Sequence, residues 1–545
     1  MKKILGATVG SCVHVAGIMN FLNIAKRVGF ETEFLGSAVS ISKLADEIAK
    51  RVPDVVGISY RLSPESSIKL FEEFEKSIAG KFNEVTYILG TTKSVADALT
   101  NSNLLKIFDR IFTGGESIQD VESYLKGTKM QDYEGNIPPQ NLLERIKYKK
   151  PYPILRHHFG RPSLSETVRG IRKISESELI DVISIGPDQN AQEFFFKPEK
   201  MNRLQDGAGG VPVRSEKDFK KLYNASRTGN YPLMRCYSGT NNILKFAELL
   251  LKNINNAWSA VPLCWYNEID NRSERKLIEA IRDNQQVMMW HAQRGVPVEV
   301  NESHHWSLRY ASDAIAVASA YLAAYNAKEM GVKTYVSQYM FNTPQETSFT
   351  MDLAKMLAKI ELIESLHDKN FFSIRQTRTG LFSMPTDFSR GKGQLASSTL
   401  LQMQLNPDII HVVAYCESSY AAKPEDIIKS SKIVLQVIEN FINGCPDMKN
   451  NEDVMNRKER LIRDAKLIIE KIKSIDKEKK YKDPLTAPEI IGKAIKAGVL
   501  DAPHLEGVKS ACGRLKTLFF NGANMPVDDC GSIISEEERL NKIRI

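Results

Sequence analysis

Apolar runs and amphipathic stretches alternate along residues 1–128 of the chain. Strands are predicted at residues 3–9, 32–35, 55–59, 85–90 and 111–112, and helical patterns end near residue 28 and span residues 41–50, 66–82 and 117–125. Strands that alternate with helices indicate a doubly wound, flavodoxin-like α/β domain whose parallel sheet is covered on both faces. Ligands of such sheets bind outside the carboxyl ends of the strands, so the residues that follow each strand are the first candidates for a site.

A longer cycle of strands and helices runs from residue 151 to residue 445. Eight near-continuous apolar runs predict strands at residues 152–158, 180–186, 231–237, 258–265, 296–301, 333–341, 371–378 and 409–417. Helical patterns lie between them at residues 163–173, 242–253, 272–288, 310–328, 349–364 and 424–442. Eight β/α units predict a (β/α)8 TIM barrel, with functional groups at the carboxyl ends of its strands.

The segments that flank the barrel have a different character. Residues 129–150 contain glycine, two adjacent prolines and a lysine-rich end, which predicts an interdomain linker with a short helix at residues 141–147. Residues 446–545 predict a helical and irregular C-terminal extension, whose first helix carries an apolar stripe through a highly charged sequence.

Composition narrows the class of protein. The 545 residues are 42% hydrophobic and 26% charged, as in ordinary globular proteins, and the net charge of +8 is spread along the chain. This mild excess suits a small anionic ligand, and no nucleic-acid module is recognisable. No apolar run reaches the roughly 18 residues that span a bilayer, and the seven cysteines form no CxxC pair, which favours a reducing compartment. We therefore expect a cytoplasmic protein without membrane or nucleic-acid partners, and the sequence leaves a homodimer open.

Small and polar residues follow the strands predicted for the first domain. They leave room for a flat, bulky ligand, and a histidine among them can reach a metal through a ring nitrogen. The candidate ligand-binding residues are Cys12, His14, Gly17, Ser59, Leu62, Gly90, Gly114 and Gly115.

These loops resemble the cobalamin-binding domain of B12-dependent mutases and methyltransferases. That family carries Asp-x-His-x-x-Gly after its first strand, then Ser-x-Leu, then a Gly-Gly turn. His14 and Gly17 match the first motif with Cys12 in place of the aspartate, and Ser59 and Leu62 match the second with one extra residue between them. By this resemblance the cofactor is cobalamin, His14 is the lower axial ligand of cobalt, and Cys12 replaces the carboxylate that normally orients the imidazole. The alternative is that His14 caps the first helix of a flavodoxin-like domain that binds another ligand.

Polar side chains cluster after the strands of the predicted barrel. The candidate catalytic residues are Arg235, Glu302 and His305, and the candidate substrate-binding residues are Arg156, Arg235, Tyr266, Arg375 and Arg378. Arginines at a barrel rim fit a carboxylate ligand, which a guanidinium binds through two parallel hydrogen bonds. Neighbouring histidines such as His304 and His305 point in different directions, so no independent metal site is predicted. A radical rearrangement fits this inventory, because the cofactor makes the radical while the protein supplies arginines and a dry cavity.

The chain after residue 151 resembles the large subunit of glutamate (methylaspartate) mutase. Residues 494–503 carry that family's alanine-rich helix and Gly-Val-x-Asp-x-Pro turn, and the resemblance extends back through the barrel at low similarity. Carried over residue by residue, it implies that Arg235 grips a substrate carboxylate and that Lys392 contacts the adenosyl group. Two further clamp arginines of the family correspond to Phe159 and Asn190 here, so the substrate is expected to differ from glutamate.

Together these features predict an adenosylcobalamin-dependent isomerase, a carbon-skeleton mutase that rearranges a small carboxylic or amino acid by radical chemistry. Two alternatives stay open at this point. One is a corrinoid-dependent methyltransferase, in which the barrel binds a methyl donor, and the other is a non-enzymatic cobalamin carrier or sensor. Release of 5′-deoxyadenosine or of a methyl group from the cofactor distinguishes the first two.

Overall fold

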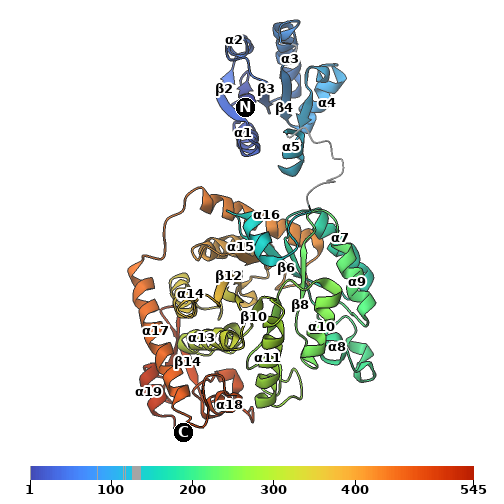
Figure 1. Ribbon diagram of the computed structural model, residues 1–545. Helices are drawn as coiled ribbons and strands as arrows, with labels where there is room; N and C mark the ends of the chain where they lie inside the picture. Colours follow the sequence, from blue (N-terminus) through green and yellow to red (C-terminus); the bar gives the residue numbers. More distant parts are fainter. Residues whose placement is uncertain (1, 83, 115, 117, 126–136, 545) are drawn as a thin grey trace. The chain divides into compact units, whose positions relative to one another are not determined.

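Two units make up the chain, and the N-terminal one contains a five-stranded parallel sheet (Figure 1). The computed structural model describes residues 2–544 apart from 83, 115, 117 and 126–136, and the units comprise Met1–Asn136 and Ile137–Ile545. The strands of the first unit are β1 (Lys3–Val9), β2 (Glu31–Val39), β3 (Val55–Tyr60), β4 (Thr86–Thr91) and β5 (Arg110–Phe112). Their order, β2-β1-β3-β4-β5, is that of a flavodoxin-like doubly wound sheet, which confirms the predicted fold class.

Helices cover both faces of this sheet, because its central strands β1 and β3 are apolar and buried on each side. One layer consists of α1 (Ala16–Val28) and α5 (Ile118–Leu125), and the other of α2 (Ile41–Arg51), α3 (Pro64–Ile78) and α4 (Lys93–Asn101). The helix predicted at residues 66–82 ends earlier, at Ile78, because the chain turns at Gly80, where φ is +70°. The sequence pattern does not predict α4.

The second unit contains an eight-stranded parallel sheet rolled into a nearly closed barrel. Its strands are β6 (Ile154–Phe159), β7 (Val182–Ile185), β8 (Leu233–Cys236), β9 (Ser259–Val261), β10 (Val298–Val300), β11 (Thr334–Phe341), β12 (Phe372–Thr379) and β13 (Ile409–His411). β6 pairs with β13, so the first and last strands close the ring, while the order of the sheet ends at β8 and β9. The Ala257 amide donates to the Met234 carbonyl at 2.9 Å across that remaining gap. The eight predicted strands and the barrel are confirmed.

Helices surround this barrel, and one of them closes its amino-terminal end. The surrounding helices are α7 (Leu164–Glu176), α8 (Gln189–Phe194), α9 (Glu216–Ala225), α10 (Ile243–Ile254), α11 (Leu277–Ala292), α12 (Ser303–Ser307), α13 (Asp313–Glu329), α14 (Phe349–Glu364), α15 (Phe388–Met403) and α16 (Pro424–Ile442). Leu142 and Ile146 of α6 (Leu142–Lys149) pack against Ile154, Val182 and Leu233, which begin three of the strands. Because α6 covers the amino ends, the carboxyl ends form the open mouth.

The C-terminal extension is held against the barrel by buried charges. It comprises α17 (Glu452–Lys473), α18 (Pro488–Ala497), the hairpin β14 (Lys516–Phe520) and β15 (Ala523–Val527), and α19 (Glu536–Asn541). Asp313 of α13 accepts hydrogen bonds from Arg457 of α17 at 2.9 Å and from the Asn524 amide of β15 at 3.1 Å, and it lies 3.4 Å from Lys355 of α14. Removing one partner from such a buried group of charges is costly in free energy. The group therefore holds the extension against the barrel helices. Across the described part of the chain, no helix is long and apolar enough to cross a membrane.

Candidate functional site

A cavity of about 500 Å³ opens at the carboxyl edge of the N-terminal sheet. Its wall combines the start of α1 with the carboxyl ends of β3, β4 and β5. Gly17, Gly90 and Gly114 lie in this wall together with the buried Ser59. A Cβ at Gly17 or Gly90 would have its nearest neighbour at 3.8 Å, and one at Gly114 would have none within 4 Å. The missing side chains of these glycines therefore leave space that a ligand can fill.

His14 and Cys12 lie in the loop between β1 and α1. The His14 side chain is exposed, whereas Cys12 is buried, and its Sγ lies 3.6 Å from Nδ1 of His14. Because this contact engages Nδ1, Nε2 is the ring nitrogen left to bind an external group. Leu62 packs against the apolar core instead of lining the cavity, and Gly115 lies outside the described residues.

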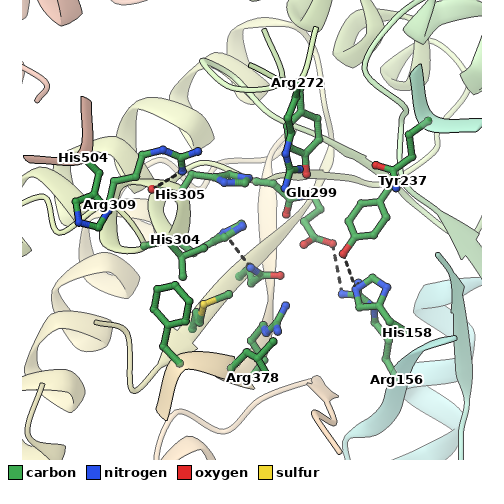
Figure 2. A pocket seen from close by; sticks show the side chains of 18 residues that line it. Arg156, His158, Tyr237, Arg272, Glu299, His304, His305, Arg309, Arg378 and His504 are labelled. Atoms are coloured by element: carbon green, nitrogen blue, oxygen red, sulfur yellow. Dashed lines mark hydrogen bonds and ion pairs between the residues drawn. The ribbon is translucent and has the colours of Figure 1, made fainter. Parts of the chain in front are cut away.

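A second cavity, of about 610 Å³, lies at the carboxyl mouth of the barrel (Figure 2). Its wall is built from residues of β6, β10, β11 and β12, from the short helices α8 and α12, and from loops that follow the strands. His504 of the C-terminal extension completes the wall. The extension therefore contributes directly to this site.

Positive charge dominates the wall of the barrel cavity. Glu299 is the one acidic side chain among its described lining residues, and it faces four arginines, Arg156, Arg272, Arg309 and Arg378. Glu299 lies 3.8 Å from Arg156 and 3.5 Å from the buried Arg235, and it accepts a 2.7 Å hydrogen bond from Nε1 of Trp258. The charge of Glu299 is thus shared between two guanidiniums, which leaves a net positive wall suited to an anionic ligand.

The guanidiniums of this wall differ in their partners. Arg309 lies 3.8 Å from Asp270. Arg272 is stacked on the ring of Tyr266 at 4.7 Å, and Arg378 donates from Nε to the Thr379 carbonyl at 3.3 Å. Burial lowers the pKa of Arg378, but a guanidinium stays protonated in proteins. Arg272 and Arg378 thus keep most of their donors for a ligand.

Burial favours the neutral form of three histidines of the barrel cavity, His158, His304 and His305. It lowers the pKa of His158, His304 and His305 well below the usual 6.5, and nearby positive groups lower it further. Arg156 donates to Nε2 of His158 at 2.8 Å, while the buried Nε2 of His305 has no hydrogen-bond partner. A neutral imidazole offers one donor and one acceptor, so His305 can form a hydrogen bond with a ligand without carrying a charge.

The structure brings four of the predicted barrel residues into one wall and leaves the others outside it. The four are Arg156, Tyr266, His305 and Arg378. Arg235 is completely buried, with Cζ 5.5 Å and 5.0 Å from the ring centroids of Tyr237 and Trp258. It lies behind the cavity wall instead of in it, so direct contact between Arg235 and a substrate is not supported by this position.

Glu302 has a structural position. Its carboxylate accepts hydrogen bonds from the backbone amides of Leu263 and Cys264 at 3.0 Å each, and from Nε1 of Trp306 at 2.8 Å. These donors occupy the carboxylate and fix the loop that follows β9. Glu302 does not line the cavity, in contrast to the catalytic position expected for it.

Arg375 and Lys392 also lie outside the cavity wall. Residues three apart on a strand point to opposite faces, so Arg378 points into the barrel while Arg375 points outward and pairs with Glu364 of α14 at 2.6 Å. Lys392, on α15, stacks over the ring of Tyr415 at 5.0 Å.

Three basic residues of the cavity wall are absent from the candidates that the sequence provides. Arg272 belongs to a helical pattern, but α11 begins only at Leu277, so Arg272 lies in the loop before it. Arg309 follows the short helix α12, and His504 belongs to the extension. Arg309 could have been found from the sequence, because it is a basic residue close to His304 and His305. No feature of the sequence places His504 beside these residues.

The fold and the two cavities define a class of protein: a doubly wound ligand-binding domain joined to a (β/α)8 barrel with a cationic mouth. Residues 2–121 match the family described as B12 binding domain. Cobalamin is therefore the cofactor of this chain. The glycine-lined cavity offers space for part of this cofactor, and the exposed imidazole of His14, which lies outside the lining of that cavity, offers a nitrogen donor. Among curated proteins, none matches the chain.

Solved structures with likeness to the chain also concern cobalamin. A cobalamin-binding protein from Desulfitobacterium hafniense DCB-2 is 22% identical, with a TM-score of 0.20 over 24% of this chain and 59% of that one. The cobalamin-dependent S-adenosylmethionine radical enzyme OxsB is similar in its apo form, at 10% identity and TM-score 0.19 over 81% of this chain and 56% of that one. Its form with aqua-cobalamin and S-adenosylmethionine is 11% identical, with TM-score 0.18 over 90% and 70% of the two chains.

Proposed function

We propose that the protein is an adenosylcobalamin-dependent isomerase that rearranges the carbon skeleton of a small carboxylic acid. The observation that carries the proposal is the presence, in one chain, of a B12 binding domain and a barrel cavity with four arginines and one acid. The chemistry that adenosylcobalamin supplies when bound is radical formation through homolysis of its cobalt–carbon bond. The resemblance of residues 494–503 to the large subunit of glutamate mutase supports the same class of reaction.

His14 is the proposed ligand of cobalt. Its Nε2 binds the metal, and Cys12 orients the ring through the 3.6 Å contact with Nδ1. A thiol polarises an imidazole less than an aspartate does, so His14 is a weaker ligand here than in proteins with the usual motif. Gly17, Gly90 and Gly114 leave the space for the nucleotide tail.

The barrel residues bind and orient the substrate. The guanidiniums of the wall hold its anionic groups, since each can donate two parallel hydrogen bonds. The Tyr237 hydroxyl and the Arg156 guanidinium both lie 2.8 Å from Nε2 of His158. This nitrogen has one lone pair, so when Arg156 occupies it the Tyr237 hydroxyl is free to donate its proton to the substrate.

The proposal is tested with the full-length protein under anaerobic conditions. It is incubated with adenosylcobalamin or methylcobalamin and a panel of small carboxylic acids that includes glutamate and 3-methylaspartate. We expect 5′-deoxyadenosine that depends on the substrate, with a rearranged carbon skeleton detected by NMR, and little turnover of glutamate or 3-methylaspartate. Demethylation of methylcobalamin instead would favour a methyltransferase, and no reaction of either cofactor would favour a carrier or sensor.

The role of His14 has a separate test. Electron paramagnetic resonance of the Co(II) form, prepared with a cobalamin that lacks a coordinating tail base, should show coupling to one nitrogen. His14→Ala should abolish this coupling without changing the tryptophan fluorescence of the barrel. An unchanged spectrum in the variant would show that His14 is not a ligand of cobalt.

A further inference from the structure

The charge pattern of the barrel cavity selects a class of substrate, and this inference rests on the proposed function of that cavity as the substrate site. We propose that the substrate is an acid with two separate anionic groups and no ammonium group. Arg272 and Arg378 each bind one anionic group, and His305 binds an uncharged polar group of the same ligand.

Arg272 and Arg378 lie on different sides of the cavity (Figure 2). Arg378 is on β12, whereas Arg272 follows β9, and β10 and β11 separate these two strands in the sheet. Among described residues, neither guanidinium forms an ion pair with an acidic side chain: Arg272 stacks on Tyr266, and Arg378 donates to a backbone carbonyl. A guanidinium with free donors binds a carboxylate or phosphate in bidentate fashion. Two such groups on different sides match two anionic groups in one ligand.

Among the described wall residues, Glu299 is the one carboxylate, and it is not available to a substrate ammonium group. Glu299 is 1% exposed and already lies near the guanidiniums of Arg156 and Arg235, and it accepts the hydrogen bond from Trp258. An ammonium in this cavity would lie among guanidiniums without a counter-charge of its own. Like charges brought together in a partly desolvated site oppose binding. Amino acids are therefore disfavoured against acids of the same shape.

His305 supplies the neutral contact. Its side chain lines the cavity, the residue is 6% exposed, and its buried Nε2 has no hydrogen-bond partner. A buried polar atom without a partner costs free energy, and a hydroxyl or carbonyl group of the ligand removes this cost. The imidazole is uncharged, so it needs no charge on that group.

The test measures binding without turnover. Full-length protein loaded with hydroxocobalamin is titrated by calorimetry with matched acids: malate against aspartate, and 2-hydroxyglutarate against glutamate. Each pair has the same carbon chain and exchanges only a hydroxyl for an ammonium group. One of the two pairs will have the carbon chain that fits the cavity better. In that pair, we expect the hydroxy diacid to bind at least tenfold more tightly than the amino acid. The affinity of this hydroxy diacid should also be at least tenfold higher than that of the monoacid 2-hydroxybutyrate.

Variants assign the contacts. Arg378→Gln and Arg272→Gln should each weaken binding of the preferred diacid at least tenfold. Arg375→Gln is the matched control, because this arginine is on the same strand as Arg378 but pairs with Glu364 outside the cavity. It should leave the affinity unchanged. Gln338→Glu adds a carboxylate to the wall and should reduce the preference for the hydroxy acid over the amino acid.

Each outcome decides part of the inference. Equal or tighter binding of the amino acid would overturn the exclusion of an ammonium group, and equal binding of the monoacid would overturn the requirement for two anionic groups. No binding of any acid at millimolar concentration would overturn both. Because no step requires adenosylcobalamin, the binding result stands even when the isomerase reaction is absent, and the two failures are distinguishable.

Discussion

Glu299→Gln removes one negative charge from the centre of the barrel and keeps an oxygen acceptor for Trp258. Arg156 and Arg235 then lose the carboxylate that lies 3.8 Å and 3.5 Å from them. At an effective dielectric constant of about 20, each of these attractions amounts to about 4–5 kcal/mol. Desolvation of the carboxylate and repulsion between the two arginines offset part of this gain, and removing one partner of a buried pair typically costs about 3–5 kcal/mol. We expect a loss of that size in the unfolding free energy of the barrel.

Tryptophan fluorescence gives a direct assay. The four tryptophans of the chain all lie in the second unit, at Trp258, Trp265, Trp290 and Trp306. Urea titration followed by this signal therefore reports the barrel and not the cobalamin domain. Glu364→Gln is the matched control, because Glu364 and its partner Arg375 have side chains 32% and 27% exposed. Such a pair contributes about 1 kcal/mol or less.

Equal losses for the two variants would refute the reasoning, since they would mean that the charge of Glu299 is no more important than an exposed one. A double variant adds a second check. Arg235→Met in the Glu299→Gln background removes one uncompensated buried cation, so it should recover part of the lost stability. Further destabilisation in the double variant would show that packing of Arg235 on its aromatic neighbours outweighs its charge.

Three further predictions follow from the two cavities. Gly90→Val places a side chain in the wall of the N-terminal cavity and should weaken cobalamin binding at least tenfold in an absorbance titration, with circular dichroism unchanged. Cys12→Asp should strengthen the imidazole–cobalt bond and enlarge the nitrogen coupling in the Co(II) spectrum; indifference would show that the imidazole is oriented by another group. Burial depresses the pKa of His158, His304 and His305 below 6.5, so the unfolded chain binds more protons below that pH. Barrel stability should therefore fall as the pH falls from about 7 to about 5, by up to about 1.4 kcal/mol per histidine per pH unit, and a flat stability profile would contradict this.

Central strands such as β1 and β3 are predictable from the sequence because they are buried on both faces and form near-continuous apolar runs, whereas the edge strand β2 is mostly exposed or half-buried. Helices with weaker patterns are not predictable in this way. The sequence of α15 contains two glycines, three serines and one threonine, yet it forms a helix because Leu395, Leu401 and Met403 pack into buried positions. This helix is stabilised by packing between segments that are distant in the sequence. Such packing produces no periodic pattern of apolar residues in the local sequence.

The types of residue in the candidate site can be predicted from the sequence, but the depth at which each side chain is buried cannot. The sequence places arginines near strand ends, and strand periodicity explains why Arg378 faces the cavity while Arg375 faces outward. It does not show how deep an inward side chain lies, and Arg235 is fully buried behind the wall. Loop residues such as Arg272 reach the cavity through the tertiary arrangement alone.

Aromatic faces stabilise two guanidiniums of the barrel cavity, and for Arg272 this contact leaves the N–H donors available to a ligand. Cζ of Arg309 lies 4.1 Å from the ring centroid of Trp265, and Cζ of Arg272 lies 4.7 Å from that of Tyr266. A cation–π contact stabilises the charge through the face of the guanidinium, whereas its N–H donors lie along the edge. A carboxylate partner would occupy those donors and cancel the charge. Stacking therefore leaves the donors of Arg272 available to a ligand, whereas Arg309 also lies 3.8 Å from Asp270. Glu299, the one acid among the described wall residues, is engaged with Arg156 and Arg235.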